Sequence, residues 1–119
     1  DPREVLAARD DGDDRARLAV DVLVHRLRAG VAAMVAALDG VDVLVFTGGI
    51  GEHLPAIREG AAAGLAHLGV AVDPSANQAA VGVEGDISAA GATVRTLVVT
   101  AREDLEIARQ VRATLPDQG

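Results

Sequence analysis

The sequence predicts an α/β domain in which helices cover a central sheet. Apolar residues predominate in two short runs, 41–47 and 94–100, which is typical of strands buried on both faces. The segments around them are longer, and their apolar residues recur at spacings of three and four, which indicates amphipathic helices. Since the two kinds of segment alternate, we expect both strands to be adjacent or near-adjacent in one sheet.

The part of the chain before residue 41 predicts two helices. Asp1 can cap a short helix, and Pro2 fits its first turn. The run DDGDD at 10–14 ends this helix, and one of its last two aspartates can cap the next. Apolar residues then recur with helical spacing, so we expect a long helix over 14–38 that stops near 39–40, where a glycine favours termination.

The strand at 41–47 is expected in the middle of the sheet, with helices covering both faces. It leads into a glycine-rich turn at 48–51, which a helix follows. Glycine permits positive φ and lets a ligand approach the backbone closely, and a helix start presents free N–H groups. From the residues alone, the turn is either a nucleotide-contacting element or a tight connection without a ligand.

The remaining elements follow from the same kinds of signal. A proline begins a predicted helix over 55–68. Residues 74–92 are rich in Pro, Ser, Asn and Gly, and we expect a loop there with a short strand near 86–88. The strand at 94–100 is then followed by a closing helix over 103–114.

The composition indicates one acidic domain. The 119 residues carry a formal net charge of −7 and include no cysteine. The charge argues against nucleic-acid and anionic-membrane partners, and the lack of cysteine excludes thiol chemistry. No apolar run approaches the roughly 18 residues of a membrane span, so we expect a cytoplasmic protein. The first residues read like the middle of a protein, and we expect a preceding segment.

Two common nucleotide-binding fingerprints do not fit the glycine turn. The phosphate-cradling pattern G-x-x-x-x-G-K-[ST] is missing, since the chain contains no lysine. The dinucleotide pattern G-x-G-x-x-G fails because Leu54 stands where the third glycine belongs. An NAD-dependent oxidoreductase is therefore disfavoured.

A resemblance to a known family narrows the alternatives. VFTGGIGEH at 45–53 resembles the adenosine-side glycine turn of the acetate kinase family, within the superfamily of actin- and ribonuclease H-like ATPase domains. DPREV at 1–5, IREG with GLAHLGVAVDPSAN between 57 and 77, and VRTLVVTAREDLEIAR at 94–109 resemble further segments of that family, in family order. The resemblance implies that residues 1–119 form the C-terminal segment of such a kinase, without its N-terminal lobe.

The resemblance also implies a reaction and a set of site residues. The reaction is phosphoryl transfer from ATP to acetate or another short-chain carboxylate, with Mg²⁺, in a homodimeric enzyme. Nucleotide contacts fall on Asp1, Pro2, Arg3, Gly49, Ile50, Gly51, Glu52 and His53. Glu103 falls on a magnesium-ligand position, and no catalytic residue falls within the chain. The residues that clamp the carboxylate and the phosphoryl group belong to the missing lobe, so we expect the chain alone to be inactive.

Each of these positions also has a purely structural interpretation. Asp1 can be a helix cap, and Glu52 and Glu103 can be acids that complement a helix dipole. The chain departs from the family where His53 and Leu54 replace Asn and Ser, and where Arg102 precedes Glu103. The alternative function is a non-catalytic module that serves packing, dimerisation or nucleotide binding.

Overall fold

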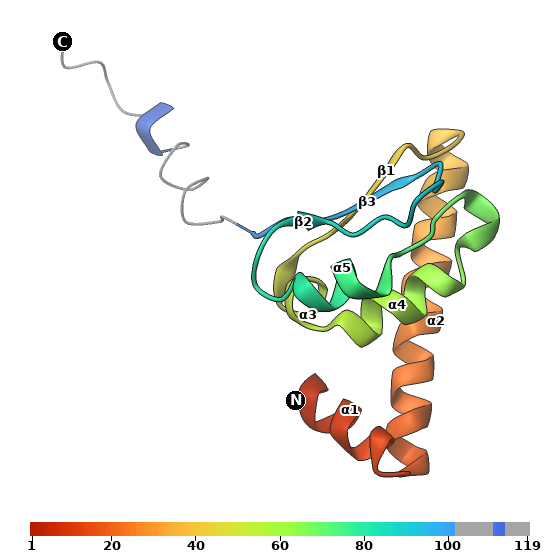
Figure 1. Ribbon diagram of the computed structural model, residues 1–119, viewed down its shortest axis with the longest axis vertical. Helices are drawn as coiled ribbons and strands as arrows, with labels where there is room; N and C mark the ends of the chain where they lie inside the picture. Colours follow the sequence, from red (N-terminus) through yellow and green to blue (C-terminus); the bar gives the residue numbers. More distant parts are fainter. Residues whose placement is uncertain (102–110, 114–119) are drawn as a thin grey trace.

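The computed structural model describes residues 1–101 and 111–113 (Figure 1). Within these residues the sheet has three strands in the order β1-β3-β2. Strand β1 (Val43–Phe46) runs parallel to β3 (Arg95–Val98), and β2 (Gly85–Asp86) runs antiparallel to β3. The α/β class and the adjacency of the two predicted strands are confirmed.

Helices α1 (Pro2–Asp10) and α2 (Asp14–Leu38) form the predicted N-terminal pair. Asp1 caps α1, since its side chain accepts a hydrogen bond from the Arg3 backbone N–H at 2.9 Å. Asp13 caps α2 in the same way, and α2 ends at Asp39 with φ 59°. Figure 1 shows α2 rising beside the rest of the domain, with α1 folded back against its lower end.

The predicted helix at 55–68 is divided in the structure. It consists of α4 (Pro55–Ala63) and a 3₁₀ turn, η1 (Ala66–Leu68), which ends at Gly69 with φ 95°. A side chain at Gly69 would also collide with the Thr93 hydroxyl, because an ideal Cβ would lie 1.9 Å from Thr93 Oγ1. This turn therefore requires glycine for both its backbone angle and the space it leaves.

The loop predicted for 74–92 was wrong over its first residues, which form helix α5 (Pro74–Ala79). Asp73 caps this helix by accepting from the Ala76 backbone N–H at 2.9 Å, and Pro74 fits its first turn. The short strand expected near 86–88 is present as β2 and an isolated bridge between Val72 and Ser88. The loop-like composition of 74–92 led to the wrong prediction, although Asp73 and Pro74 are residues that favour the start of a helix.

The prediction that 41–47 is a central strand buried on both faces was also wrong. Strand β1 lies at the edge of the sheet, and β3 is the central strand. Val43 and Val45 are 49% and 47% exposed, whereas β3 buries Thr96 and Val98. The described part of the chain supplies a strand on one side of β1 only and leaves the Val43 and Val45 face open.

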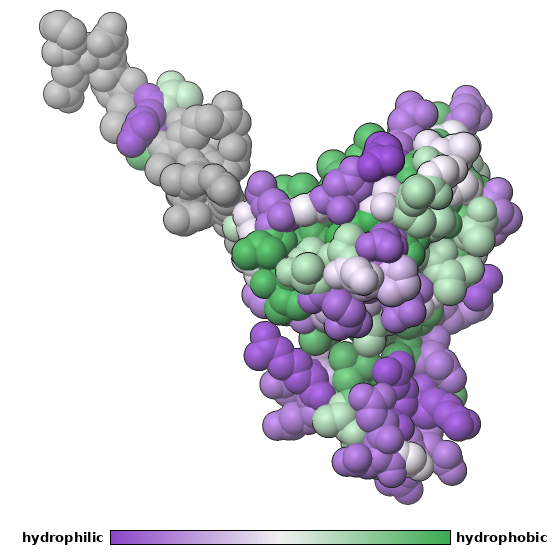
Figure 2. Space-filling view, in the orientation of Figure 1, coloured by the Kyte–Doolittle hydropathy of each residue, from purple (hydrophilic) through white to green (hydrophobic). Residues whose placement is uncertain are grey.

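The core consists of small aliphatic groups between the sheet and the helices. One cluster joins α4 to β3 and contains Ala62, Leu65, Val70 and Val94. A second joins α2 to α4 and contains Val20, Leu54 and Ile57. In the face shown in Figure 2, the arm formed by α1 and α2 is largely polar, and apolar residues gather where it meets the body.

An exposed ion pair connects the two C-terminal strands of the sheet. Arg95 on β3 donates to the Asp86 carboxylate on β2. This hydrogen bond and those from Ser88 lower the pKa of Asp86 to about 2. The carboxylate therefore stays ionised, and keeps its Arg95 contact, down to strongly acidic pH.

The helix predicted at 103–114 lies outside the described residues, except for 111–113, which are helical. Glu103 lies outside them as well. Within the described part of the chain, no helix is both long enough and apolar enough to cross a membrane.

We expect Thr96→Val to stabilise the fold. Thr96 is fully buried, and its Oγ1 has no hydrogen-bond partner among the described residues. Replacing the hydroxyl by a methyl group of similar shape removes an unsatisfied polar atom, which should raise the free energy of unfolding by about 1 kcal/mol. Urea unfolding of the chain measures this change.

Thr100→Val is the matched control, because the Thr100 hydroxyl donates to Glu84 Oε1 at 3.0 Å. This second replacement should leave stability unchanged or lower it. A Thr96→Val chain that unfolds at lower urea concentration than the unaltered chain would show that the hydroxyl has a partner.

Candidate functional site

The glycine-rich segment after β1 forms helix α3 (Gly48–His53) rather than the predicted turn. Glycine costs about 1 kcal/mol relative to alanine inside a helix, so local propensity does not explain α3. Only Gly48 has a positive φ, 79°, whereas Gly49 and Gly51 do not. The positive φ that glycine permits in this turn is therefore used at Gly48 but not at Gly49 or Gly51. Since local propensity opposes the helix, contacts from other parts of the chain must hold it.

Tertiary hydrogen bonds fasten the C-terminal end of α3. The Gly82 backbone N–H donates to the Glu52 carbonyl at 3.0 Å. The Arg58 guanidinium donates through Nη1 to the Gly51 carbonyl at 2.8 Å. A Cβ on Gly51 would lie 3.2 Å from the carbonyl carbon of Phe46, so glycine allows α3 to lie close to the strand it follows.

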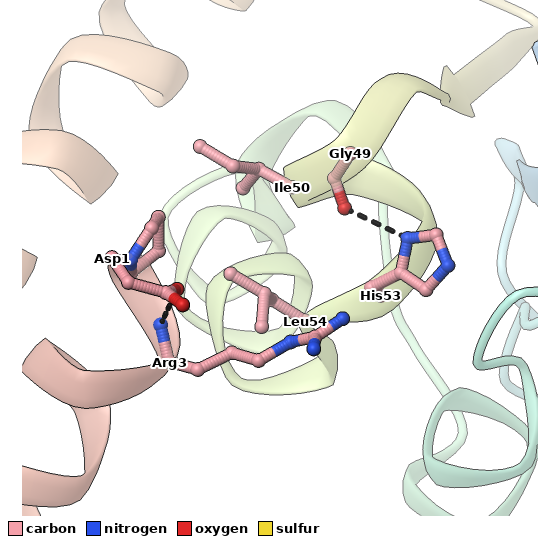
Figure 3. A pocket seen from close by; sticks show the side chains of 7 residues that line it. Asp1, Arg3, Gly49, Ile50, His53 and Leu54 are labelled. Carbon is pink, nitrogen blue, oxygen red and sulfur yellow. Dashed lines mark hydrogen bonds between the residues drawn. The ribbon is translucent and has the colours of Figure 1, made fainter.

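A pocket of about 250 Å³ lies between the start of α1 and α3 (Figure 3). Its walls come from two segments that are far apart in the sequence. The lining residues are Asp1, Pro2, Arg3, Gly49, Ile50, His53 and Leu54. The structure thus brings together six of the eight residues for which nucleotide contacts were predicted, with Leu54 in addition.

The pocket combines apolar walls with two charged side chains. Ile50 and Leu54 face the interior from the α3 side, and the Arg3 side chain extends across from α1 beneath them (Figure 3). The Asp1 carboxylate is already engaged by the Arg3 backbone N–H, so it orders the start of α1. Such a pocket suits a flat, largely apolar group with an anionic substituent near Arg3.

His53 is held by its own helix. Its Nδ1 donates to the Gly49 carbonyl at 3.0 Å. The other ring nitrogen is turned away from Asp1 and Arg3 in Figure 3 and faces the turn at Gly82. His53 therefore closes the pocket with its ring and keeps the Gly49 end of α3 in place.

Gly51 and Glu52 are not among the residues that line the pocket. Glu52 is buried, and its Oε2 accepts from the Ala101 backbone N–H at 3.2 Å. It thus joins α3 to the chain just beyond β3, two positions before Glu103. This contact fixes the Glu52 side chain within the fold, and the nucleotide contact predicted for Glu52 stays a prediction.

Sequence reasoning did not identify Arg58 and Asn77 as residues of the site. Both are buried, and they are hydrogen-bonded to each other and to the carbonyls around α3. The sequence did contain one indication of their role. Arg58 lies next to Ile57 on the apolar side of the helix predicted at 55–68, where a charged residue is unexpected. An arginine on a buried stripe requires acceptors close by.

No group of three or more metal-binding side chains occurs within residues 1–101 and 111–113. A larger hollow of about 610 Å³ lies between α2 and β1, but it is lined almost entirely by aliphatic groups. The pocket at α1 and α3 is therefore the candidate ligand site in the described part of the chain.

Comparison with known proteins identifies relatives over nearly the whole chain. The model of the acetokinase family matches residues 1–109. The acetate kinase of Gloeobacter violaceus is 46% identical over 110 residues, which are 92% of this chain and 27% of that protein. The acetate kinase of Moorella thermoacetica is 46% identical over 113 residues, or 95% of this chain and 28% of that protein.

Solved structures agree with these sequence matches. The acetate kinase of Porphyromonas gingivalis superposes with a TM-score of 0.89 at 36% identity, over 98% of this chain and 29% of that one. A propionate kinase from Francisella tularensis gives a TM-score of 0.84 at 34% identity, over 92% of this chain and 28% of that protein. The chain spans about a quarter of the length of the curated relatives that it matches. The fold is that of the actin-like ATPases, and the chain belongs to the acetokinase family.

Proposed function

We propose that this chain forms the adenosine side of the nucleotide site in an acetate kinase-like phosphotransferase. The complete protein would transfer the terminal phosphoryl group of ATP to acetate or another short-chain carboxylate, which yields ADP and an acyl phosphate. One observation carries the proposal. Two segments that resemble the nucleotide-contacting segments of the family meet at a single pocket, through residues 1–3 on one side and Gly49, Ile50 and His53 on the other.

The size and chemistry of the pocket support a partial nucleotide contact. Ligand sites usually enclose roughly 300–1,000 Å³, and this pocket encloses about 250 Å³. It therefore fits an adenine or adenosine group better than a whole ATP molecule. The apolar side chains of Ile50 and Leu54 suit the faces of a purine, and the Arg3 guanidinium suits a phosphate.

The rest of the reaction requires groups beyond this chain. Phosphoryl transfer depends on positioning and on cations that neutralise the developing charge. The chain has a net charge of −7 and no lysine, and Arg58 is buried with its donors engaged. We propose that the acceptor carboxylate and the moving phosphoryl group are held by the part of the kinase that this chain does not span.

We propose Glu103 as the ligand that this chain offers to Mg²⁺. A bound Mg²⁺ would neutralise charge on the phosphates, and it commonly takes one or two carboxylates together with phosphate oxygens and water. A dedicated protein cage is therefore not required. The Glu52 contact to Ala101 supports this assignment, since it joins α3 to a residue only two positions before Glu103 in the sequence.

A non-catalytic packing or dimerising module is the second candidate function. The apolar face of β1 favours it, because Val43 and Val45 are about half exposed beside Met34 and Leu38 of α2. The two functions are compatible in a homodimeric, cytoplasmic kinase. They differ in whether the pocket at α1 and α3 binds ATP.

We expect Gly49→Val to weaken ATP binding while leaving the fold intact. An ideal Cβ at Gly49 meets no heavy atom within 4 Å, and Gly49 lines the pocket, so the new side chain should occupy ligand space. The test uses a hybrid kinase, in which this chain replaces the matching 110-residue segment of the Gloeobacter violaceus acetate kinase. Calorimetry should show ATP affinity lowered by about tenfold or more.

Gly30→Val is the control for this replacement. Gly30 also lies in a helix with open space around its Cβ, but it is remote from the pocket. ATP affinity should be unchanged in that variant. Equal affinity in a well-folded Gly49→Val hybrid would refute the ligand role of the pocket.

We expect the isolated chain to form no acetyl phosphate, whereas the hybrid kinase should form it. The reason is the missing set of cations around the phosphoryl group. Hydroxamate trapping measures the product in both samples. Turnover by the isolated chain at the rate of the hybrid would contradict the division of the site proposed here.

We expect Glu103→Gln in the hybrid to raise the Mg²⁺ concentration needed for half-maximal velocity and to lower turnover. The amide keeps the size of the side chain but removes the charge that would attract the ion. Glu59→Gln, at an exposed position of α4, is the matched control. Unchanged magnesium dependence would refute the assignment of Glu103 as a magnesium ligand.

A further inference from the structure

We propose that Arg58 is a positioning residue of the nucleotide pocket. It holds α3 at the angle that presents Gly49 and Ile50 to the start of α1. The inference rests on the proposed nucleotide site and adds a residue that touches neither the pocket nor a ligand. Its basis is a set of four hydrogen bonds from one buried guanidinium.

Arg58 is fully buried, and three of its nitrogens are hydrogen-bonded. Nε donates to Asn77 Oδ1 at 2.7 Å, and Nη1 donates to the Gly51 carbonyl at 2.8 Å. Nη2 donates to the carbonyls of Asn77 and Ala80 at 2.6 and 2.7 Å. One side chain of α4 thereby connects the end of α3 to the end of α5.

The Gly51 carbonyl needs a donor from outside its own helix. In a continuous helix its partner would be the backbone N–H four residues later, but that residue is Pro55, which has none. Arg58 Nη1 supplies the missing donor. Since α3 has only six residues and is too short to be stable alone, this bond helps to fix where the helix lies.

Asn77 fixes the guanidinium in turn. Its Oδ1 accepts from Arg58 Nε, and its Nδ2 donates to the Pro55 carbonyl at 2.9 Å. Both halves of the Asn77 amide are therefore used, and the first turn of α4 is tied to α5. The plane of the guanidinium is set by these contacts, which directs Nη1 at Gly51.

The partners of Arg58 make a purely stabilising role a poor explanation. Among the described residues, its acceptors are all neutral amide or carbonyl oxygens, and burial lowers the pKa of Arg58. Burying a charge without an opposite charge is unfavourable, and an apolar side chain of similar volume often stabilises a core as well. An apolar side chain, however, cannot donate a hydrogen bond to the Gly51 carbonyl, as Arg58 does.

The central test is Arg58→Lys in the hybrid kinase. The ammonium group keeps the charge but lacks the planar fork that reaches all four acceptor oxygens, so α3 should lose its fixed position. We expect the KM for ATP to rise about tenfold, while the KM for the carboxylate stays unchanged. Arg28→Lys, at an exposed position of α2, is the matched control and should change neither constant.

Hydrogen exchange separates positioning from general loss of stability. In Arg58→Lys the amides of 48–54 should exchange faster, whereas those of α2 and β3 should keep their protection. Faster exchange throughout the domain, with an unchanged KM for ATP, would overturn the inference. If the unaltered hybrid binds no ATP, the proposed function fails, and the exchange pattern alone decides whether Arg58 positions α3.

Asn77→Ala covers the case in which Arg58→Lys does not fold. It leaves the guanidinium in place and removes the acceptor of Nε, so Nη1 should be less well directed. We expect the KM for ATP to rise about threefold, again with the KM for the carboxylate unchanged. An unchanged KM for ATP in a folded Asn77→Ala hybrid would contradict the role of Arg58.

Discussion

One buried guanidinium joins the short helices α3, α4 and α5, and α3 forms one wall of the candidate site. The core offers these helices little else, since its clusters are made of alanine, valine, leucine and isoleucine, and the chain has a single aromatic residue. Small aliphatic groups contribute burial but little direction, because the hydrophobic effect does not depend on orientation. The hydrogen bonds of Arg58 supply the direction, and they set α3 and α5 relative to α4.

The elements that could be predicted are those whose signals are local. Aspartate caps and helical spacing identified α1 and α2, and two apolar runs identified adjacent strands. Helix α3 could not be predicted in this way, because three glycines oppose a helix and the bonds that hold it come from Gly82 and Arg58. The open face of β1 was missed for a similar reason. An apolar strand shows that its faces avoid water, but not which segment covers them.

The same distinction applies to the candidate site: features with local sequence signals could be predicted, and those set by contacts between distant residues could not. The sequence resemblance pointed to both walls of the pocket, since the motifs at 1–3 and 49–53 can be read directly and six of their eight residues line it. It could not show that Glu52 turns from the pocket to Ala101, because that contact joins residues far apart in the chain. Arg58 and Asn77 were missed because the need of the Gly51 carbonyl for a donor appears only when the helices are in place.

The placement of α1 has a consequence for how tightly the pocket can hold a ligand. One wall of the pocket is carried by α1, which packs chiefly against the lower part of α2, and the other wall belongs to the body of the domain (Figure 1). Val5 and Leu6 contribute the apolar contacts that dock α1 beside Leu54 and Ile57. The apparent dissociation constant is then the intrinsic constant divided by the fraction of molecules in which α1 is docked. A change in the fraction of molecules with α1 docked would therefore change affinity without replacing a single pocket residue.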